Sequence, residues 1–171
     1  MENFTNQKIR TDDFPAYQEV LLTPLDTDYW KVILINSIIF LIIIGLLGSA
    51  FIYFQPEIVV NAWLALGLFG AFSVLVIISK YLTFKSQKYA FRDHDVIYQS
   101  GYIAKITTVI PCNRVQHVTL LEGFVSKQFN LAKVGIFTAG GKGSDIEVPG
   151  IKKEEAERIK ILLTAKILKQ L

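Results

Sequence analysis

The sequence is poor in the residues that most often carry metals and nucleophilic chemistry. It has one cysteine, Cys112, and two histidines, His94 and His117, in 171 residues. A single cysteine can form no intrachain disulfide, which suits a protein that faces a reducing compartment. On an extended strand, Cys112 and His117 would lie about 16 Å apart and point to opposite faces. We therefore predict no catalytic residue, no metal site and no cofactor.

Charge is missing from two long stretches. Residues 32–54 (VILINSIIFLIIIGLLGSAFIYF) and 58–78 (IVVNAWLALGLFGAFSVLVII) contain no Asp, Glu, Lys or Arg. At about 1.5 Å per helical residue, either stretch can cross a hydrocarbon layer of about 30 Å. A buried helix of a soluble domain would normally show a polar face, and a signal peptide would not follow a polar segment of 31 residues. The two stretches therefore predict membrane-spanning helices.

The two predicted helices should form a tight hairpin. QPE, residues 55–57, is all that separates the uncharged stretches, so the helices must turn back at once and lie antiparallel. Pro56 breaks the helix at this turn. Small residues fall at matched depths on the two sides of Pro56, and small residues let membrane helices pack closely. We expect the packing seam to consist of Gly45, Gly48, Ala65 and Gly67.

Basic residues around the hairpin predict its orientation. The turn has no Lys or Arg, whereas both outer flanks do: Lys8, Arg10 and Lys31 before the first helix, and Lys80, Lys85, Lys88 and Arg92 after the second. The positive-inside rule then places both termini in the cytoplasm. Residues 80–171 carry 15 basic against 8 acidic side chains, so this basic part should lie directly beneath the bilayer.

The rest of the chain divides into a lead-in and a β-rich domain. Prolines and acidic residues in 1–31 predict an extended lead-in, with Tyr29 and Trp30 as interfacial anchors. We divide the chain into this lead-in, a hairpin over 32–79 and a domain over 80–171. Alternating apolar residues in the domain predict antiparallel strands with one buried face, in the segments TFKSQKYAF, VIYQS, YIAKITTVI, VGIFT and DIEVP.

Two further segments complete this domain. TAGGKGSD, residues 138–145, is typical of a hairpin loop and lacks the Gly-Lys-Ser/Thr helix start that a phosphate-binding loop needs. Residues 152–169 predict a helix, because acidic residues begin it and lysines end it. Its apolar face should pack on the sheet rather than on the membrane surface; that face consists of Ile159, Leu162, Leu163, Ile167 and Leu171.

Several short motifs follow one another in this domain. In chain order they are Tyr89, Gly101, Ile110-Pro111, Arg114-Val115-Gln116 with Val118, EGFVSKQFNLA, and Thr138-Ala139-Gly140-Gly141. Together they resemble the bacterial PH-like domain family, in its membrane-bound YdbS-like type. The resemblance covers residues 80–171, and the preceding hairpin is similar to that family's usual anchor. It implies an α+β fold, with a PH-like antiparallel sheet or barrel closed by the C-terminal helix, and no enzyme activity.

The resemblance also implies roles for single residues. Structural roles fall on Gly101, Pro111, Gln116, Gly140 and Gly141. Lys127 stands where the family often has Arg, so the charge is kept without the bidentate fork. Asn130 stands where Gly is usual, and Asn tolerates the left-handed backbone conformation that such a turn needs.

The stretch IPCNRVQHV, residues 110–118, is interpreted as a strand entry and not as an enzyme site. On a regular strand, Gln116 shares a side with Val118 and Leu120, so we expect it to be buried and hydrogen-bonded. A role in ligand binding is the alternative. For Arg114 both interpretations stay open, because no carboxylate lies nearby in the sequence.

The leading hypothesis for function is a non-catalytic binding module that the hairpin holds at the cytoplasmic leaflet of the bacterial inner membrane. Anionic lipids would be contacted by Lys85, Lys88, Arg114 and Lys127. Lys85 and Lys88 could instead serve only to set the topology. The alternative function is a protein-interaction subunit that pairs with a second PH-like membrane protein or with itself. We predict no nucleic-acid partner.

Overall fold

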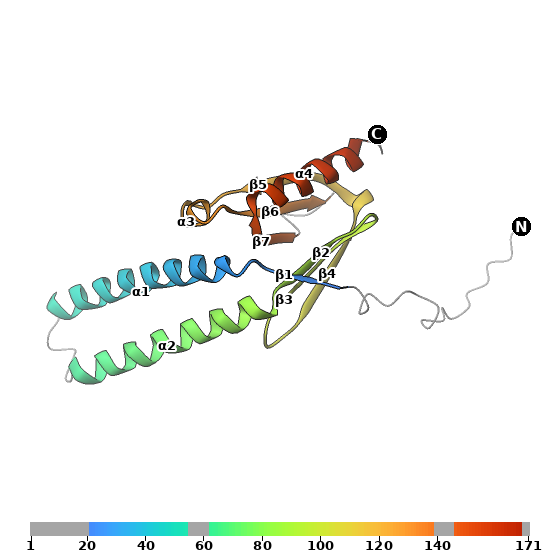
Figure 1. Ribbon diagram of the computed structural model, residues 1–171. Coiled ribbons are helices and arrows are strands. Elements are labelled where there is room, and N and C mark those ends of the chain that lie inside the picture. Colours follow the sequence, from blue (N-terminus) through green and yellow to red (C-terminus); the bar gives the residue numbers. More distant parts are fainter. Residues whose placement is uncertain (1–20, 55–61, 139–145, 169–171) are drawn as a thin grey trace, which may run out of the picture.

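The computed structural model describes residues 21–54, 62–138 and 146–168, and these ranges have an α+β fold as predicted. Two long helices, α1 (Asp28–Phe54) and α2 (Ala62–Ser86), form the arm in Figure 1. The strands of the described ranges are β1 (Thr23–Pro24), β2 (Lys88–Phe91), β3 (Asp95–Ser100), β4 (Ile106–Pro111), β5 (Val115–Leu121), β6 (Leu131–Thr138) and β7 (Ile146–Lys152). A 3-10 turn (Cys112–Arg114) follows β4, and two helices, α3 (Phe124–Gln128) and α4 (Lys153–Leu168), complete the chain.

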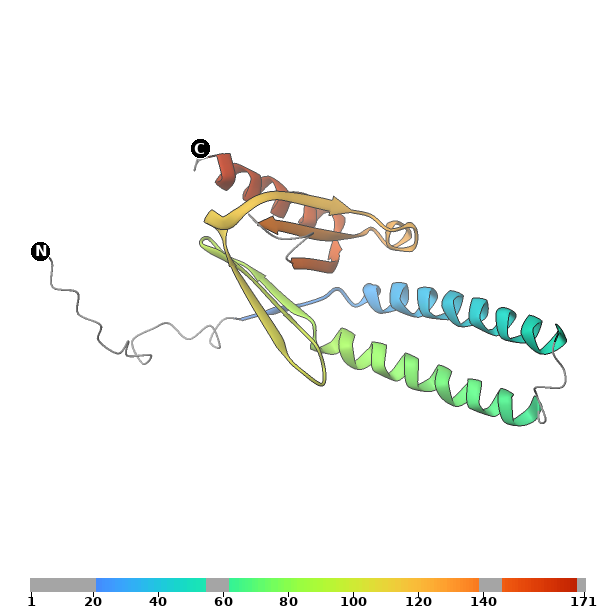
Figure 2. The same cartoon turned by 180° about the vertical axis from the view of Figure 1, so that it is seen from behind.

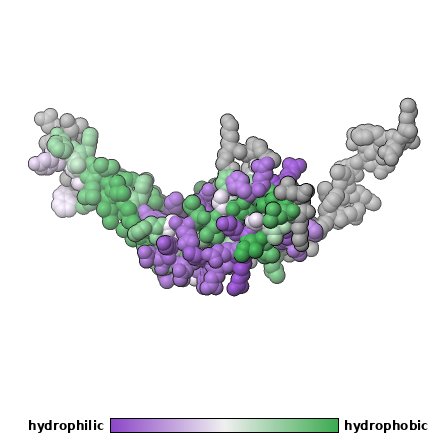
Figure 3. Space-filling model, turned by 90° about the horizontal axis from the view of Figure 1, so that it is seen from above, coloured by the Kyte–Doolittle hydropathy of each residue, from purple (hydrophilic) through white to green (hydrophobic). Residues whose placement is uncertain are grey.

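The arm has the length and surface of a membrane hairpin. Both helices are long and apolar enough to cross a membrane, and Figure 3 shows the arm as a continuous hydrophobic surface beside a mainly hydrophilic domain. α1 begins at Asp28, four residues before the uncharged stretch. The Asp28 backbone N–H donates to the Asp26 carboxylate at 2.9 Å, and Asp28 adds a negative charge to the first turn. Both features stabilise a helix start.

α2 ends later than the sequence suggested. Thr83–Ser86 was expected in a strand, but these residues form the last turn of the helix. Aromatic contacts with the start of α1 explain the extension. Trp30 packs edge-on against Tyr81 with ring centroids 5.0 Å apart, and Phe84 lies 6.0 Å from Trp30 and 6.3 Å from Tyr29. Tyr81 and Phe84 can face α1 together because they are three residues apart on a helix.

The predicted packing seam is wrong for two of its glycines. A Cβ atom added at Gly45 would lie 3.5 Å from the Phe69 ring, so this glycine is in contact with α2. A Cβ atom added at Gly48 or Gly67 would meet nothing within 4 Å, and Ala65 is half-buried. Equal distance from Pro56 fixes how deep a residue lies, but it does not fix which way the residue points around the helix.

The strands form two antiparallel sheets. The first has the order β1-β2-β3-β4 and the second the order β5-β6-β7. The chain passes from one sheet to the other where β4 runs through Cys112–Arg114 into β5, at the corner visible in Figure 2. α4 packs on the second sheet, against β5, β6 and β7. We call the two sheets with α3 and α4 the head domain.

The head domain begins before the membrane hairpin. Thr23 pairs with Tyr89 and Pro24 with Lys88, so β1 adds a strand to the sheet from the segment expected to be a lead-in. Leu25 is 4% exposed and belongs to the hydrophobic core. Residues 1–20 of the predicted lead-in lie outside the described ranges. The hairpin is therefore an insertion between the first two strands of the head domain.

The core is shared by both sheets and α4. Its fully buried side chains are those of Val96, Val134, Ile136, Val148 and Ile151, and Ile97 and Leu131 are also buried, one in each sheet. Ile159 and Leu163 of α4 join this core and Ile167 packs against it, as predicted. Leu162 was expected on the same face but is exposed. The predicted Leu171, Gly140 and Gly141 lie outside the described ranges.

Gly101 makes the turn between β3 and β4. Its φ is +94°, and an added Cβ would lie 2.1 Å from the Ala104 carbonyl oxygen, so the turn needs glycine. The tight loop after Gly101 delays β4 until Ile106, although the alternation suggested a strand from Tyr102 onward. Ile110 is buried at the end of that strand, whereas Ile106 is exposed.

A β-bulge at the start of β5 places Gln116 on the surface. The register between β5 and β6 shifts between Val115 and His117, which leaves Gln116 as the extra residue. Val115 and Val118 are buried, and Gln116 is exposed. The expectation that Gln116 is buried is therefore wrong, because a bulge breaks the alternation on which it depended.

Tyr29, in the first turn of α1, lies directly against the head domain at Gly150. Gly150 has a φ of +66°, and an added Cβ would lie 2.5 Å from Cγ of Tyr29. The Asp26 backbone N–H donates to the Gly150 carbonyl at 3.0 Å. The residue at position 150 must therefore be glycine both for its backbone conformation and for the approach of the tyrosine ring.

We expect Gly150→Ala to destabilise the protein. The left-handed conformation alone costs a non-glycine residue roughly 1–2 kcal/mol, and the clash with Tyr29 adds to it. The melting temperature of the full chain in mild detergent should fall by several degrees. Gly123→Ala is the control, because Gly123 has a φ of −69° and the nearest atom to an added Cβ is 3.6 Å away. Equal melting of the two variants would contradict the close contact at Gly150.

Gln116→Ala should leave the stability nearly unchanged. Exposed side chains away from special contacts usually change the free energy of unfolding by less than about 0.5 kcal/mol. Val118→Ala, two residues along the same strand, removes a buried side chain and should cost about 2 kcal/mol. Thermal unfolding of both variants measures the difference. A loss in Gln116→Ala as large as that in Val118→Ala would show a structural role for the glutamine.

Candidate functional site

Lys85 and Lys88 lie where the hairpin meets the head domain. Lys85 is in the last turn of α2, and Lys88 begins β2 three residues later. Both side chains are exposed. The Lys85 ammonium lies 4.9 Å from the centroid of the Tyr81 ring, one helical turn earlier. This cation–π contact orients Lys85 along the helix, toward the hydrophobic arm.

α3 brings a third predicted lysine to the same end of the arm. The helix packs against α1 and lies beside its first turns in Figure 1. Lys127 is exposed in the last turn of α3, and Phe124 at its start is 86% exposed. Asn130, which follows, has a φ of +53°, as expected for a residue that replaces glycine there. Lys85, Lys88 and Lys127 are thus carried by three elements at the head-domain end of the arm, which we call the lysine end.

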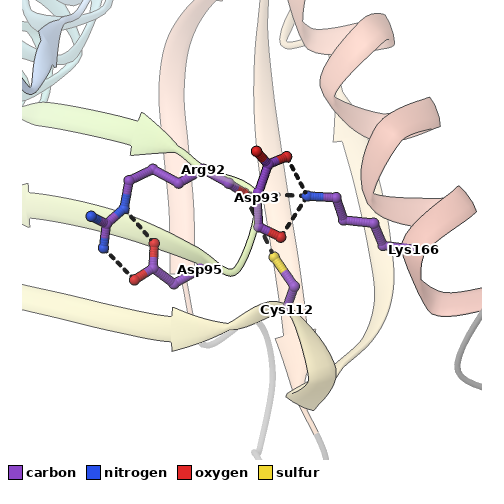
Figure 4. A network of polar contacts seen from close by, with 5 residues as sticks. All are labelled: Arg92, Asp93, Asp95, Cys112 and Lys166. Atoms are coloured by element: carbon purple, nitrogen blue, oxygen red, sulfur yellow. Dashed lines mark hydrogen bonds and ion pairs between the residues drawn. The ribbon is translucent and has the colours of Figure 1, made fainter.

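Arg114 lies away from the lysine end. It closes the 3-10 turn Cys112–Arg114, which packs against α4. Figure 4 shows the neighbourhood: Lys166, in the last turn of α4, donates to the Asp93 carbonyl at 2.6 Å and to its carboxylate at 3.2 Å. Figure 1 places this end of α4 on the side of the head domain that faces away from the arm. The four predicted contact residues therefore do not share one surface.

The lone cysteine is poorly placed for nucleophilic chemistry. Cys112 is 4% exposed, and its thiol points to the Arg92 carbonyl oxygen at 3.9 Å. Burial raises the pKa of the Cys112 thiol, so the reactive thiolate is disfavoured. His117 stacks on Phe137, with ring centroids 4.1 Å apart. Among the residues that the structure describes, no group of three His, Cys, Asp or Glu side chains could hold a metal ion.

Acidic side chains near the core of the head domain are held by partners. Lys133 and Glu147 form an ion pair of 2.7 Å across β6 and β7, and Lys153 and Glu122 form one of 3.0 Å. The Tyr89 hydroxyl donates to Glu155 at 3.2 Å. Burial, and to a smaller extent the negative charge of Glu155, raises the pKa of Tyr89. This hydrogen bond ties β2, and through it the end of α2, to α4.

A groove between the helices was not predicted from the sequence. It has a volume of about 420 Å³ and lies between the head-domain ends of α1 and α2. We call it the junction groove; its walls are formed by Tyr29, Ile33, Asn36, Ser37, Phe40, Val76, Lys80, Thr83, Phe84 and Gln87. A signal was present in the sequence, because Asn36 and Ser37 are polar residues inside an otherwise apolar stretch.

Comparisons with known proteins place the whole arrangement in a family. The family model described as "Bacterial PH domain" matches residues 31–167, which include the hairpin as well as most of the head domain. The chain is also 29% identical over 141 residues to the UPF0699 transmembrane protein YdbS of Bacillus subtilis (strain 168). That alignment covers 81% of this chain and 86% of the relative. No solved structure matches the chain.

The family match and the structure agree on the architecture. Two helices able to span a membrane precede all but the first strand of a domain of antiparallel sheets with a C-terminal helix, and the relative is itself a transmembrane protein. The chain is thus a membrane protein that belongs to the bacterial PH domain family.

Proposed function

We propose that this protein is a non-catalytic binding module, anchored in the bacterial inner membrane, which contacts anionic lipid at the cytoplasmic leaflet. The lysine end is the observation that carries the proposal. Lys85, Lys88 and Lys127 are exposed there, and none of them forms an ion pair with a residue of the described ranges. Unpaired ammonium groups beside an apolar arm are suited to bind lipid phosphates.

Position decides how much these charges contribute. Each Lys or Arg close to an anionic membrane surface contributes on the order of 1 kcal/mol, and the effect fades within a Debye length of about 8 Å. Lys85 and Lys88 follow the uncharged part of α2 by seven and ten residues, and α3 lies beside the first turns of α1. Arg114, at the other end of the head domain, is outside this range and is not part of the proposed lipid contact.

The charge distribution supports a cytoplasmic head domain. Residues 80–171 hold 15 basic and 8 acidic side chains, whereas the turn QPE holds no basic one. The positive-inside rule then places the lysine end, and both termini, on the cytoplasmic side. The anionic phospholipids of that leaflet would face the lysines directly.

The non-catalytic part of the proposal is supported by the chemistry of the described residues. Cys112 is buried with a raised pKa, and His117 is stacked on an aromatic ring and not oriented toward a nucleophile. An enzyme site would need a base next to a nucleophile and a third group to orient it.

The outer face of α4 favours a second candidate, a protein-interaction subunit. Ile161 is 68% exposed, and Leu162 and Leu168 are exposed beside it. Figure 3, which looks down on the α4 side, shows hydrophobic side chains on the otherwise hydrophilic head domain. This face would suit a second PH-like membrane protein or another copy of the chain, since exposed apolar patches mark interaction surfaces.

Removal of the lysines should weaken the retention of anionic lipid. We expect Lys85→Gln/Lys88→Gln to bind phosphatidylglycerol roughly 30-fold more weakly than the native chain, because two lysines near the surface contribute about 2 kcal/mol. Native mass spectrometry of the full chain, purified with equal amounts of phosphatidylglycerol and phosphatidylcholine, counts the bound lipids.

The matched control removes two positive charges elsewhere. Arg158→Gln/Lys160→Gln lies on the exposed side of α4 and should retain anionic lipid like the native chain. If the native chain shows no preference for phosphatidylglycerol but self-associates through α4, the interaction candidate replaces the lipid one. If both double variants lose lipid equally, net charge and not the lysine end is responsible.

The topology gives a second test. Single cysteines at positions 57 and 160, in a Cys112→Ala background, should react differently with a membrane-impermeant thiol reagent in intact cells. Position 57, which lies between the two helices in the sequence, should be labelled in intact cells, and position 160, on α4, should be labelled after the cells are lysed. Labelling of position 160 in intact cells would place the head domain outside and would contradict the cytoplasmic assignment.

A further inference from the structure

The junction groove has an amphipathic wall. Three of its apolar side chains, Ile33, Phe40 and Val76, belong to the uncharged stretches of α1 and α2, and the rings of Tyr29 and Phe84 lie just outside them. Its polar side chains are Asn36, Ser37, Lys80, Thr83 and Gln87. No Asp or Glu is among the described residues that line it. A cavity with apolar walls and a few placed donors is typical of a site for an amphipathic ligand.

The groove lies at the boundary between membrane and water. Asn36 follows the start of the uncharged stretch at Val32 by four residues, or about 6 Å along the helix. Lys80 is the first charged residue after the uncharged stretch of α2. The polar part of the groove therefore runs from the edge of the hydrocarbon layer, at Asn36, into the headgroup region at Lys80 and beyond, and its deeper apolar part is at the depth of acyl chains.

Three polar side chains of the groove have no partner among the described residues. Asn36, Lys80 and Gln87 make no side-chain hydrogen bond or ion pair with any residue in 21–54, 62–138 or 146–168. Thr83 donates to the Ser79 carbonyl of its own helix at 2.8 Å, which leaves its oxygen free to accept. An ammonium and two amides offer several donors, and at a membrane boundary those donors need acceptors.

The groove leads into the head domain. A second cavity, of about 390 Å³, shares Tyr29, Asn36 and Gln87 with it and continues to Tyr98 and Ser126. Burial raises the pKa of Tyr98 to about 12, so its hydroxyl stays protonated and available as a donor. Gly150 and Lys133 also line this second cavity, and Lys133 is paired with Glu147.

We propose that the junction groove binds one phospholipid with an anionic headgroup. The phosphate would be held by Lys80 with the amides of Asn36 and Gln87, and one acyl chain would follow Phe40 and Val76 toward the membrane centre. The proposal rests on the proposed lipid-binding function and adds to it a single site. That site is distinct from Lys85 and Lys88, neither of which lines the groove.

Charge complementarity selects this occupant over a second protein chain. A phosphodiester supplies acceptors and a negative charge, which match the unpaired ammonium and amide donors. The same molecule supplies a flexible apolar chain, which matches the apolar wall. A transmembrane segment of a partner would satisfy the wall but would leave the donors unpaired.

Trp30 is a natural reporter for the groove. Its ring lies 6.0 Å from that of Phe84, which lines the groove, and 5.0 Å from that of Tyr81. The chain has two tryptophans, and the other, Trp63, is at the far end of α2 and exposed. Trp63→Phe therefore leaves Trp30 as the sole emitter, and bromine atoms on a lipid bound in the groove would quench it.

The experiment uses the full chain with Trp63→Phe in phosphatidylcholine vesicles. Dibrominated phosphatidylglycerol or dibrominated phosphatidylcholine replaces increasing fractions of the host lipid, and the quenching curves give the relative binding constant of the two lipids near Trp30. We expect phosphatidylglycerol to be favoured about fivefold, the factor that one lysine contributes. Lys80→Gln should abolish the preference, and Lys80→Arg should keep it.

A second pair of variants tests whether the bound lipid occupies the junction groove. Asn36→Phe places a ring in the groove and should also abolish the preference, whereas Ile35→Phe, on the adjacent residue that does not line the groove, should keep it. The variant Lys85→Gln/Lys88→Gln distinguishes the groove from the lysine end.

A preference that survives Lys80→Gln and Asn36→Phe but is lost in the Lys85/Lys88 variant overturns the groove site and leaves the proposed lipid-binding function standing. Equal loss in all lysine variants also overturns the groove site, because the preference would then depend on net charge. If the parent chain shows no preference, both the groove site and the proposed function are rejected.

Discussion

The contact of Tyr29 with Gly150 sets how the membrane helices meet the head domain. The tyrosine ring takes the space that a side chain at position 150 would fill, and the neighbouring Asp26 N–H is hydrogen-bonded to the same backbone unit. Phe84 of α2 also packs against the tyrosine ring, with ring centroids 6.3 Å apart. One aromatic ring thereby touches both helices and the second sheet. The groove, the lysine end and the direction of the arm all follow from where this ring is held.

Strand pairing adds a second restraint to the same place. β1 leads into α1 and β2 follows α2, and the two strands are antiparallel neighbours. Neighbouring strands are about 4.8 Å apart, which is closer than two packed helices can lie. The helices must therefore diverge as they leave the sheet, and aromatic side chains fill part of the space between them. The part left open is the junction groove, so the groove is a consequence of inserting a helical hairpin between paired strands.

Much of this architecture could be predicted from the sequence, and the failures have physical reasons. The absence of charge over 32–54 and 58–78 identified both helices, because the cost of charge in a bilayer leaves a clear pattern. The end of α2 at Ser86 depends on contacts of Tyr81 and Phe84 with α1, which no local pattern records. A strand as short as β1 has no periodicity to detect, and its pairing with β2 exists in three dimensions alone.

The candidate site was harder to predict than the fold, because a site depends on direction as well as position. Gln116 has the sequence spacing of a buried residue, yet it is the extra residue of the β-bulge between β5 and β6 and therefore lies on the surface. Arg114 and Lys127 are thirteen residues apart, but Arg114 precedes strand β5 and Lys127 follows it, so the length of this strand separates them to opposite ends of the head domain. Lysines that pair within the domain, such as Lys133 and Lys153, look in sequence like those left unpaired at the membrane end. Composition therefore records that the domain is basic, and the fold decides which of its charges remain free to meet a membrane.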